Sequence, residues 1–224
     1  LKLSGDVLPG PDRWDQCLSV ASSHPVGLIA RWVQHYSQDQ ATTVALHGVW
    51  TPSTIVAVEP EAISHPVDEK LGLWARHEID GFVVWSGGMR EMVEFLKGHA
   101  VRRVQDPAAA RAVAATARLS PRVCVDYCAG RGTKTRQLAA THPGCRVVAT
   151  DADAGRLADL RQSMKGLENV EVVGLGAIEQ ACPKGTADLL VLDVPCSNTG
   201  VLGRRPEARY RFSQRSLDSL IELQ

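Results

Sequence analysis

The stretch PRVCVDYCAGRGTKTRQLAATH, residues 121–142, decides the fold class of this chain. Residues 121–127 have the apolar character of a buried strand, and residues 133–142 follow as a helix. Gly130 and Gly132 stand between them, where glycine lets the backbone turn sharply and lets a ligand approach closely. The start of a helix adds free amide donors to such a turn. The stretch therefore predicts a strand, a ligand-binding turn and a helix, without the GxxxxGK[ST] spacing of a P-loop.

The same alternation continues along the rest of the chain. It predicts strands over residues 145–151, 170–176 and 187–195, and a helix over residues 153–166. Apolar runs alternating with amphipathic helices are typical of βαβ units and a parallel sheet, in which ligands bind beyond the carboxyl ends of the strands. The predicted fold class is therefore α/β, with a Rossmann-like parallel sheet.

Asp151 ends the second of these strands, twenty-one residues after Gly130. A carboxylate at that place can accept hydrogen bonds from both hydroxyls of a ribose. A carboxylate in this position can bind the ribose of a nicotinamide dinucleotide and that of S-adenosylmethionine equally well. The alternative is that Asp151 only caps the helix that follows.

The first hundred residues predict a different, smaller α/β layer, which makes 1–104 one domain and 105–224 a second. Residues 1–100 hold seven Lys and Arg against twelve Asp and Glu, whereas residues 101–224 hold eighteen against thirteen. This split favours an anionic ligand on the second domain. Helices are predicted over 23–36, 38–47, 67–78, 87–98 and 106–119, and strands over 53–59, 81–86 and 100–104.

Six cysteines and 44% apolar residues indicate a reduced, intracellular protein with a proper core. The cysteines form no CxxC pair and have no zinc spacing, so no metal is expected. No apolar run approaches the roughly 20 residues that a membrane span needs. We therefore expect a cytoplasmic protein without a membrane partner.

The stretch DVPCSNTGVLGRRPEARYR, residues 193–211, follows the last predicted strand. Asp193 and Cys196 are expected in the same crevice as Asp151, where a thiol can serve as a nucleophile. Cys196 could instead be a small buried filler, and Asp193 a loop cap. Arginines around the aromatic Tyr210 suit phosphate contact and base stacking, although a solvated charged face is the simpler alternative. These candidate RNA-binding residues are Arg204, Arg205, Arg209 and Arg211.

These motifs resemble the RsmB/Sun-type family of S-adenosylmethionine-dependent RNA 5-methylcytosine methyltransferases. Residues 126–135, DYCAGRGTKT, are similar to the family's cofactor motif DxCAxPGGKT. Residues 193–206, DVPCSNTGVLGRRP, are similar to its catalytic-loop motif DxPCSxTGxxRRxP. VQDPAAARAV (104–113) and SHPVGLIARWVQHY (23–36) resemble the family's linker and a helix of its N-terminal RNA-binding segment. The resemblance implies a class I methyltransferase domain that acts on cytosine carbon-5 in ribosomal or transfer RNA.

The resemblance also implies roles for single residues. Asp151 holds the cofactor's ribose, Lys134 lies near its carboxylate, and Asp193 bonds the edge of the target cytosine and helps to order the site. In this family the cysteine at position 196 assists product release, and the attacking thiol lies in a later TCS motif. The expected cofactor-binding residues are Cys128, Ala129, Gly130, Arg131, Gly132, Thr133, Lys134, Asp151 and Asp193.

The chain departs from the family pattern in three ways. Arg131 and Thr133 stand where the family has proline and glycine, and Gly174 and Gly176 leave the third strand without an acid for the adenine amino group. The printed sequence also stops before the TCS motif, so the expectation is a truncated parallel sheet, with the nucleophile outside this chain, and a chain that is inactive alone. A catalytically inactive RNA-binding protein on a degenerate methyltransferase fold is the main alternative. Two further alternatives remain. In one, Cys196 is itself the nucleophile; in the other, the protein is a nicotinamide-dependent dehydrogenase.

Overall fold

A computed structural model of the chain describes residues 12–59, 72–97, 99 and 101–224. The described residues form two compact units. We call residues 53–194 the sheet unit, and residues up to Pro52 together with 195–224 the helical unit. None of the helices in these described ranges is long and apolar enough to cross a membrane.

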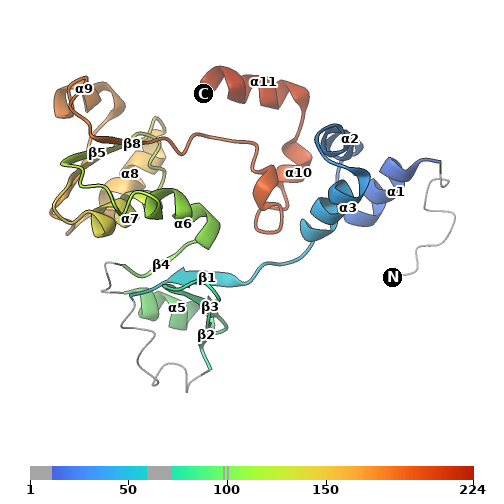
Figure 1. Cartoon of the computed structure of the whole chain (residues 1–224), viewed down its shortest axis with the longest axis horizontal. Coiled ribbons are helices and arrows are strands. Elements are labelled where there is room, and N and C mark those ends of the chain that lie inside the picture. Colours follow the sequence, from blue (N-terminus) through green and yellow to red (C-terminus); the bar gives the residue numbers. More distant parts are fainter. Residues whose placement is uncertain (1–11, 60–71, 98, 100) are drawn as a thin grey trace. The chain divides into compact units, whose positions relative to one another are not determined.

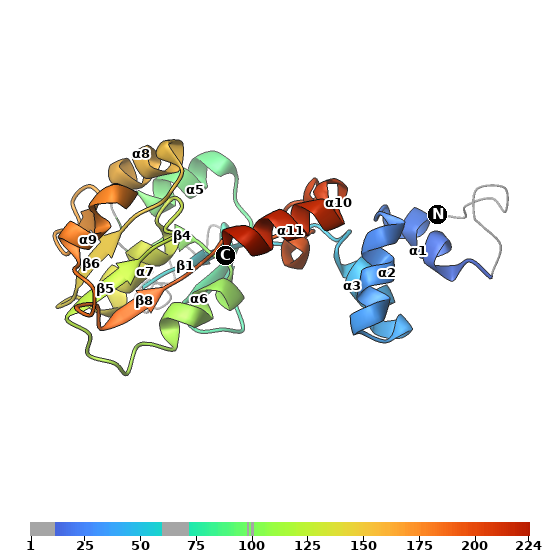
Figure 2. The same cartoon turned by 90° about the horizontal axis from the view of Figure 1, so that it is seen from above.

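The sheet unit contains a parallel sheet in the order β7-β6-β5-β8. Figure 2 labels β6, β5 and β8 of this sheet. Register is continuous from β7 to β8, with Val125 opposite both Val148 and Leu190. On one face, α7 and α8 bury Leu138 and Leu160 against the sheet; on the other, Leu190 is 52% exposed. The elements are β5 (Val123–Asp126), α7 (Thr133–Thr141), β6 (Arg146–Ala149), α8 (Ala154–Ser163), β7 (Val170–Val172), η2 (Leu175–Ala177), α9 (Ile178–Ala181) and β8 (Leu189–Val191). The predicted α/β class and its strand–helix alternation are confirmed.

A second, antiparallel sheet lies in the same unit, in the order β2-β3-β1-β4 (Figure 1). Its apolar face packs against Met92 and Phe95 of α5, and the Phe95 ring lies 5.1 Å from that of Trp85. Its elements are β1 (Thr54–Ala57), β2 (Trp74–Arg76), β3 (Phe82–Trp85), α5 (Met89–Leu96) and β4 (Arg103–Val104), followed by α6 (Pro107–Ala114).

One predicted element is wrong. The helix expected over 67–78 is replaced, in its described part, by a turn and the strand β2. Trp74 is buried and pairs with Trp85, whereas Ala75 and Arg76 are exposed, so tertiary pairing of two tryptophans decides the conformation. Residues 67–71, and the predicted helix end at Gly98, lie outside the described residues.

The helical unit joins the two ends of the described chain in one core. Leu28 and Ile29 of the N-terminal helices cluster with Leu202 and Ala208. Ser37 and Gln40 form a reciprocal capping box at the start of α3. Its elements are α1 (Trp14–Ser22), α2 (Val26–His35), α3 (Gln38–His47), η3 (Thr199–Val201), α10 (Ala208–Arg211) and α11 (Gln214–Leu223). The domain boundary predicted between residues 104 and 105 falls inside the sheet unit and stays a prediction.

Candidate active site

The carboxyl ends of β5 and β8 mark the point where the strand order of the parallel sheet reverses. Connections from β5 lead to β6 and β7 on one side, while β8 pairs with β5 on the other. Loops that leave such a point in opposite directions open a crevice for a ligand. Asp126 is the last residue of β5, and Asp193 follows β8 by two residues.

The glycine turn after β5 takes a conformation that favours glycine at both positions. Gly130 has φ +58° and Gly132 has φ +89°. A Cβ on Gly132 would come within 2.7 Å of a Leu160 methyl group, so this glycine also allows α7 and α8 to pack closely. A Cβ on Gly130 would meet no described atom within 4 Å. Gly130 is thus the position at which a ligand can approach the backbone.

Asp151 braces this turn. Its Oδ2 accepts a hydrogen bond from the Gly130 amide at 2.9 Å, and its Oδ1 accepts one from the Asp153 amide at 2.9 Å. The cap of α8 is Asp153, whose side chain accepts from Arg156 N. Asp151 is therefore not the helix cap that the alternative interpretation required, and each of its carboxylate oxygens keeps a lone pair for a ligand.

Asp126 is a site residue that the sequence analysis missed. The side chain is fully buried; its Oδ2 accepts from the Thr135 hydroxyl at 2.7 Å, and its Oδ1 has no hydrogen-bond partner among the described residues. Burial, above all, raises the pKa of this carboxyl from 3.8 to about 6. A carboxylate kept at such a place, with one free oxygen, is a candidate ligand acceptor. The signal available in the sequence was an acid at the last position of a buried strand, directly before the glycine turn.

Lys134 and Asp193 join the two sides of the switch point. Lys134 Nζ donates to Asp193 Oδ2 at 2.5 Å. The Lys134 side chain, on α7, is only 18% exposed. The neighbouring Cys128 thiol has its pKa raised, first by burial and then by Asp151, Asp126 and Asp193. Cys128 is therefore held in its neutral form at physiological pH.

The residues that depart from the family pattern have clear positions. Arg131 pairs with Asp159 of α8 at 3.3 Å, in an exposed ion pair. Thr133 is exposed at the first position of α7. Gly174 and Gly176 follow β7, where a Cβ on either would meet no described atom within 4 Å. Neither glycine supplies a side chain for the expected adenine contact.

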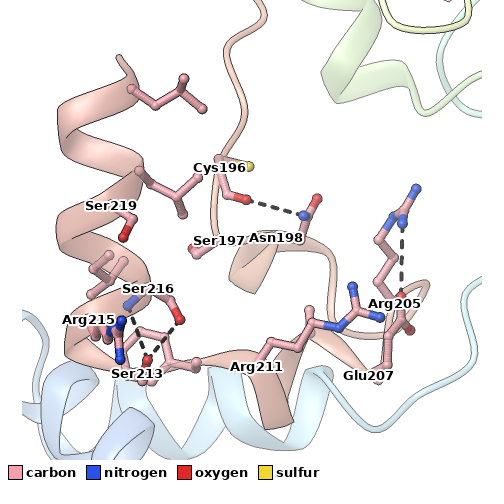
Figure 3. Close-up of a pocket in the computed structure, with 15 residues that line it drawn as sticks. Cys196, Ser197, Asn198, Arg205, Glu207, Arg211, Ser213, Arg215, Ser216 and Ser219 are labelled. Atoms are coloured by element: carbon pink, nitrogen blue, oxygen red, sulfur yellow. Dashed lines mark hydrogen bonds and ion pairs between the residues drawn. The ribbon is translucent and has the colours of Figure 1, made fainter. Parts of the chain in front are cut away.

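Cys196 belongs to the helical unit and is exposed. It lines a pocket of about 510 Å³ between the loop after Pro195 and α11. Figure 3 shows Cys196 and Asn198 on one side of this pocket and Ser216 and Ser219 of α11 on the other. Exposure excludes the buried-filler interpretation of this thiol.

Three of the four candidate RNA-binding arginines are exposed, namely Arg204, Arg205 and Arg211. Arg205 and Arg211 line the pocket together with Arg215, which the sequence analysis had not chosen. Arg209 differs, because it is only 6% exposed and its guanidinium donates to backbone carbonyls. A buried guanidinium with such partners is not available to a phosphate, so we correct the expected RNA contact of Arg209 to a structural role.

The parallel sheet, its order and its glycine turn define a Rossmann-like fold, and methyltransferases are among the solved structures that share its shape. A methyltransferase homologue from Pyrococcus horikoshii has a TM-score of 0.65, with 17% identity, over 88% of this chain and 67% of its own. NSun6 from Pyrococcus horikoshii has a TM-score of 0.62, with 12% identity, over 89% of this chain and 77% of its own. At these identities the likeness concerns the fold alone.

Sequence comparison identifies the family. Residues 117–224 match the family model described as 16S rRNA methyltransferase RsmB/F, and this part of the chain belongs to that family. Ribosomal RNA small subunit methyltransferase B of Yersinia pseudotuberculosis is 33% identical over 103 residues, which cover 45% of this chain and 24% of the relative. The Yersinia pestis protein of the same name matches equally well. The matched part of the chain thus spans about a quarter of the length of these curated relatives.

Proposed function

We propose that the sheet unit binds S-adenosylmethionine at the switch point and that the protein transfers its methyl group to cytosine carbon-5 in RNA. The observation that carries the proposal is the charge of the site. Asp126, Asp151 and Asp193 bring three carboxylates to this edge of the sheet, where Lys134 neutralises one, while Arg131 is paired with Asp159. An excess of negative charge favours a cofactor that carries a sulfonium and an ammonium, and it repels the pyrophosphate of a dinucleotide.

The residues present fit this cofactor. The free lone pairs of Asp151 can accept hydrogen bonds from ribose hydroxyls, and the open space beside Gly130 allows close approach to the backbone. The free oxygen of Asp126 is a natural acceptor for an ammonium group, and Lys134 is a natural partner for a carboxylate. When bound, S-adenosylmethionine supplies an electrophilic methyl group. The chain's own residues hold it, exclude the dinucleotide and keep Cys128 protonated.

Calorimetry on the 224-residue chain tests the cofactor assignment. We expect saturable binding of S-adenosylmethionine and a loss of about tenfold in affinity for Asp151→Ala, because a charged hydrogen-bond acceptor contributes about 1.5 kcal/mol or more. Asp153→Asn is the matched control, since asparagine still caps α8. Binding of a nicotinamide dinucleotide in preference to S-adenosylmethionine would overturn the assignment.

RNA is the proposed substrate, and ribosomal RNA is the first to test. Both curated relatives described above are named as ribosomal RNA methyltransferases. Arg204, Arg205 and Arg211 are exposed on either side of Tyr210, which is 71% exposed. Guanidinium groups contact phosphates and an exposed ring stacks on an unpaired base, so this arrangement suits single-stranded RNA.

The chemistry of cytosine explains why a thiol is required. Carbon-5 is a weak nucleophile until a thiolate adds to carbon-6, which makes carbon-5 electron-rich enough to take a methyl group. Loss of the carbon-5 proton then expels the thiol and restores the ring. We infer that Asp193 bonds the cytosine edge and that Cys196 assists release of the product. The attacking thiol then comes from a part of the family's proteins that this chain does not span.

RNA that contains 5-fluorocytosine separates these roles, because fluorine at carbon-5 blocks the final proton loss. In a protein that carries both this chain and the family's TCS motif, we expect a covalent protein–RNA adduct both in the wild type and in Cys196→Ala. Disappearance of the adduct in Cys196→Ala would instead make Cys196 the nucleophile. Formation of an adduct with methylation at any atom other than carbon-5 would contradict the proposed reaction.

A non-catalytic RNA-binding protein is the second candidate, and the glycines after β7 favour it. Gly174 and Gly176 offer the adenine no side-chain acceptor. The same calorimetry decides between the two: RNA binding without any S-adenosylmethionine binding would support the second candidate. Asp126 argues for the first, because a buried carboxylate that keeps one oxygen unpaired at the switch point is best explained by a bound ligand.

A further inference from the structure

Arg209 connects the loop that carries Cys196 to the N-terminal helices. Its Nη1 donates to Ser22 O at 3.3 Å and to Ser23 O at 3.4 Å, and its Nη2 donates to Gly48 O at 2.9 Å. The side chain comes from α10 and is buried. At least 161 residues of sequence separate it from each of these partners.

The three carbonyls belong to helix ends. Ser22 is the last residue of α1 and Ser23 is its C-cap, in a left-handed conformation with φ 55°. Gly48 is the C-cap of α3. Carbonyls at helix C-termini lack helical partners and carry the negative end of the helix dipole. One guanidinium therefore caps two helices at once, which the planar fork of arginine can do and the single ammonium of lysine cannot.

Apolar contacts continue the same junction. Leu202 and Ala208 are buried in the core formed by the N-terminal helices. Gly203 lies so close to the N-terminal segment that an added Cβ would come within 2.7 Å of Trp50 O. His24 is buried beside Arg209, and its ring packs against Trp32 at 5.3 Å. The junction thus fits the loop closely both before α10 and at the start of α10.

We propose that Arg209 is a positioning residue that fixes the loop from Cys196 to Arg211 on helices α1 to α3. Fixing this loop sets where Cys196, Arg205 and Arg211 face their substrate, without any contact between Arg209 and RNA. The significance of the loop rests on the proposed function. The attachment itself rests on the hydrogen bonds and the packing of the helical unit.

Hydrogen exchange measured by mass spectrometry on the 224-residue chain tests the attachment. In Arg209→Met we expect exchange in residues 196–211, and at the ends of α1 and α3, to rise at least about tenfold, since buried carbonyls lose their donors. Exchange in the parallel sheet should stay as in the wild type. Arg209→Lys should give an intermediate rise, because an ammonium can serve only part of the junction. Arg211→Met is the matched control, an exposed arginine two residues away.

Three outcomes would overturn the inference: unchanged exchange in the loop, an equal rise along the whole chain, or a rise as large in Arg211→Met. If Arg209→Met does not fold, Gly203→Ala serves instead, since it pushes the same loop from Trp50. Exchange that stays unchanged in Gly203→Ala would then contradict the proposal.

Binding measurements separate this inference from the proposed function. In a protein that carries both this chain and the family's TCS motif, we expect Arg209→Met to raise KM for RNA about tenfold. The Kd for S-adenosylmethionine should stay unchanged, because the cofactor residues lie in the sheet unit. Partial rescue of KM by Arg209→Lys, in proportion to its intermediate exchange, would identify a positioning role. If the wild type binds no S-adenosylmethionine, the proposed function fails, while the exchange data still decide whether Arg209 holds the loop.

Discussion

Two buried charges, one in each compact unit, are held in different ways. Arg209 in the helical unit gives hydrogen bonds to three backbone carbonyls, and only its Nε has no partner among the described residues. Asp126 in the sheet unit receives one hydrogen bond, from Thr135, and one of its two oxygens is left over. The pKa of Asp126 is raised by burial, so its charge opposes folding at neutral pH.

The hydrogen bonding of these two charges indicates a structural role for Arg209 and a ligand-binding role for Asp126. A buried charge whose donors are taken up by the chain's own backbone stabilises the arrangement that it caps. A buried charge that keeps an acceptor free, at the point where a sheet opens to ligands, lowers stability and is best explained by a ligand. Substitutions at these two places should therefore change stability in opposite directions.

The largest effect is expected at Arg209. Arg209→Met leaves three carbonyls without donors and should lower the free energy of unfolding by about 3 kcal/mol, as in other broken buried networks. Denaturant melts followed by circular dichroism measure it. Arg205→Met, at an exposed arginine paired with Glu207 at 3.9 Å, should change stability by less than about 1 kcal/mol. An equal loss of stability in Arg209→Met and Arg205→Met would show that the hydrogen bonds of Arg209 do not stabilise the helical unit.

Asp126→Asn should act in the opposite direction. The carboxyl has a pKa of about 6 in the folded protein against an ordinary 3.8, so protonation favours the folded state. The stabilisation that the protonated Asp126 carboxyl gives to the folded state is complete below pH 3.8. It is lost as the pH rises through about 6, and it stays lost at higher pH. Two pKa units correspond to about 3 kcal/mol, and the introduced amide keeps a polar group buried, so we expect a gain of about 2 kcal/mol at pH 8.

Urea melts between about pH 4 and pH 8 check this prediction. The difference between variant and wild type should grow as the pH rises to the folded-state pKa of about 6 and then become constant. Affinity for S-adenosylmethionine should fall at the same time. A stabilised variant with unchanged cofactor affinity would show that the free oxygen of Asp126 serves no ligand.

The sequence was sufficient for the parallel sheet and insufficient for these two charges. Strands such as 121–127 have apolar runs bounded by turn residues, and their class does not depend on distant contacts. Gly130, Gly132 and Asp151 follow from strand ends, because the carboxyl ends of parallel strands always meet at one edge. The wrong helix over 67–78 arose where pairing of Trp74 with Trp85 outweighed local pattern.

Arg209 could not be distinguished from its neighbours by sequence. Within RRPEARYR every arginine has the same local composition, and the carbonyls that hold Arg209 lie at least 161 residues away. Burial of a charged residue depends on a junction between remote segments, which no periodicity encodes. The burial of Asp126 could have been predicted from the sequence, because the last side chain of a buried strand has little access to solvent.

Thr135→Val refines the description of Asp126 with a smaller change. Burial raises the pKa of this carboxyl, and the Thr135 hydroxyl, the one described donor to it, lowers the pKa, so loss of the hydroxyl should raise it further. We expect a loss of about 1 kcal/mol at pH 8 and almost none at pH 4, where a protonated carboxyl needs no donor. Melts at the two pH values test this. A loss that is equal at both would indicate packing, not the hydrogen bond, as the cause.

The smallest effect on stability is expected for the pair Lys134 and Asp193. Their contact is short, 2.5 Å, but the Asp193 side chain is 57% exposed, so solvent screens the attraction. A double-mutant cycle with Lys134→Gln and Asp193→Asn should give a coupling of less than about 1 kcal/mol in denaturant melts. The same two substitutions should each weaken S-adenosylmethionine binding, because each removes a charge from the switch point of the parallel sheet. A large coupling energy in the melts, together with unchanged cofactor binding, would show that this pair has a structural role like that of Arg209 and no role in ligand binding.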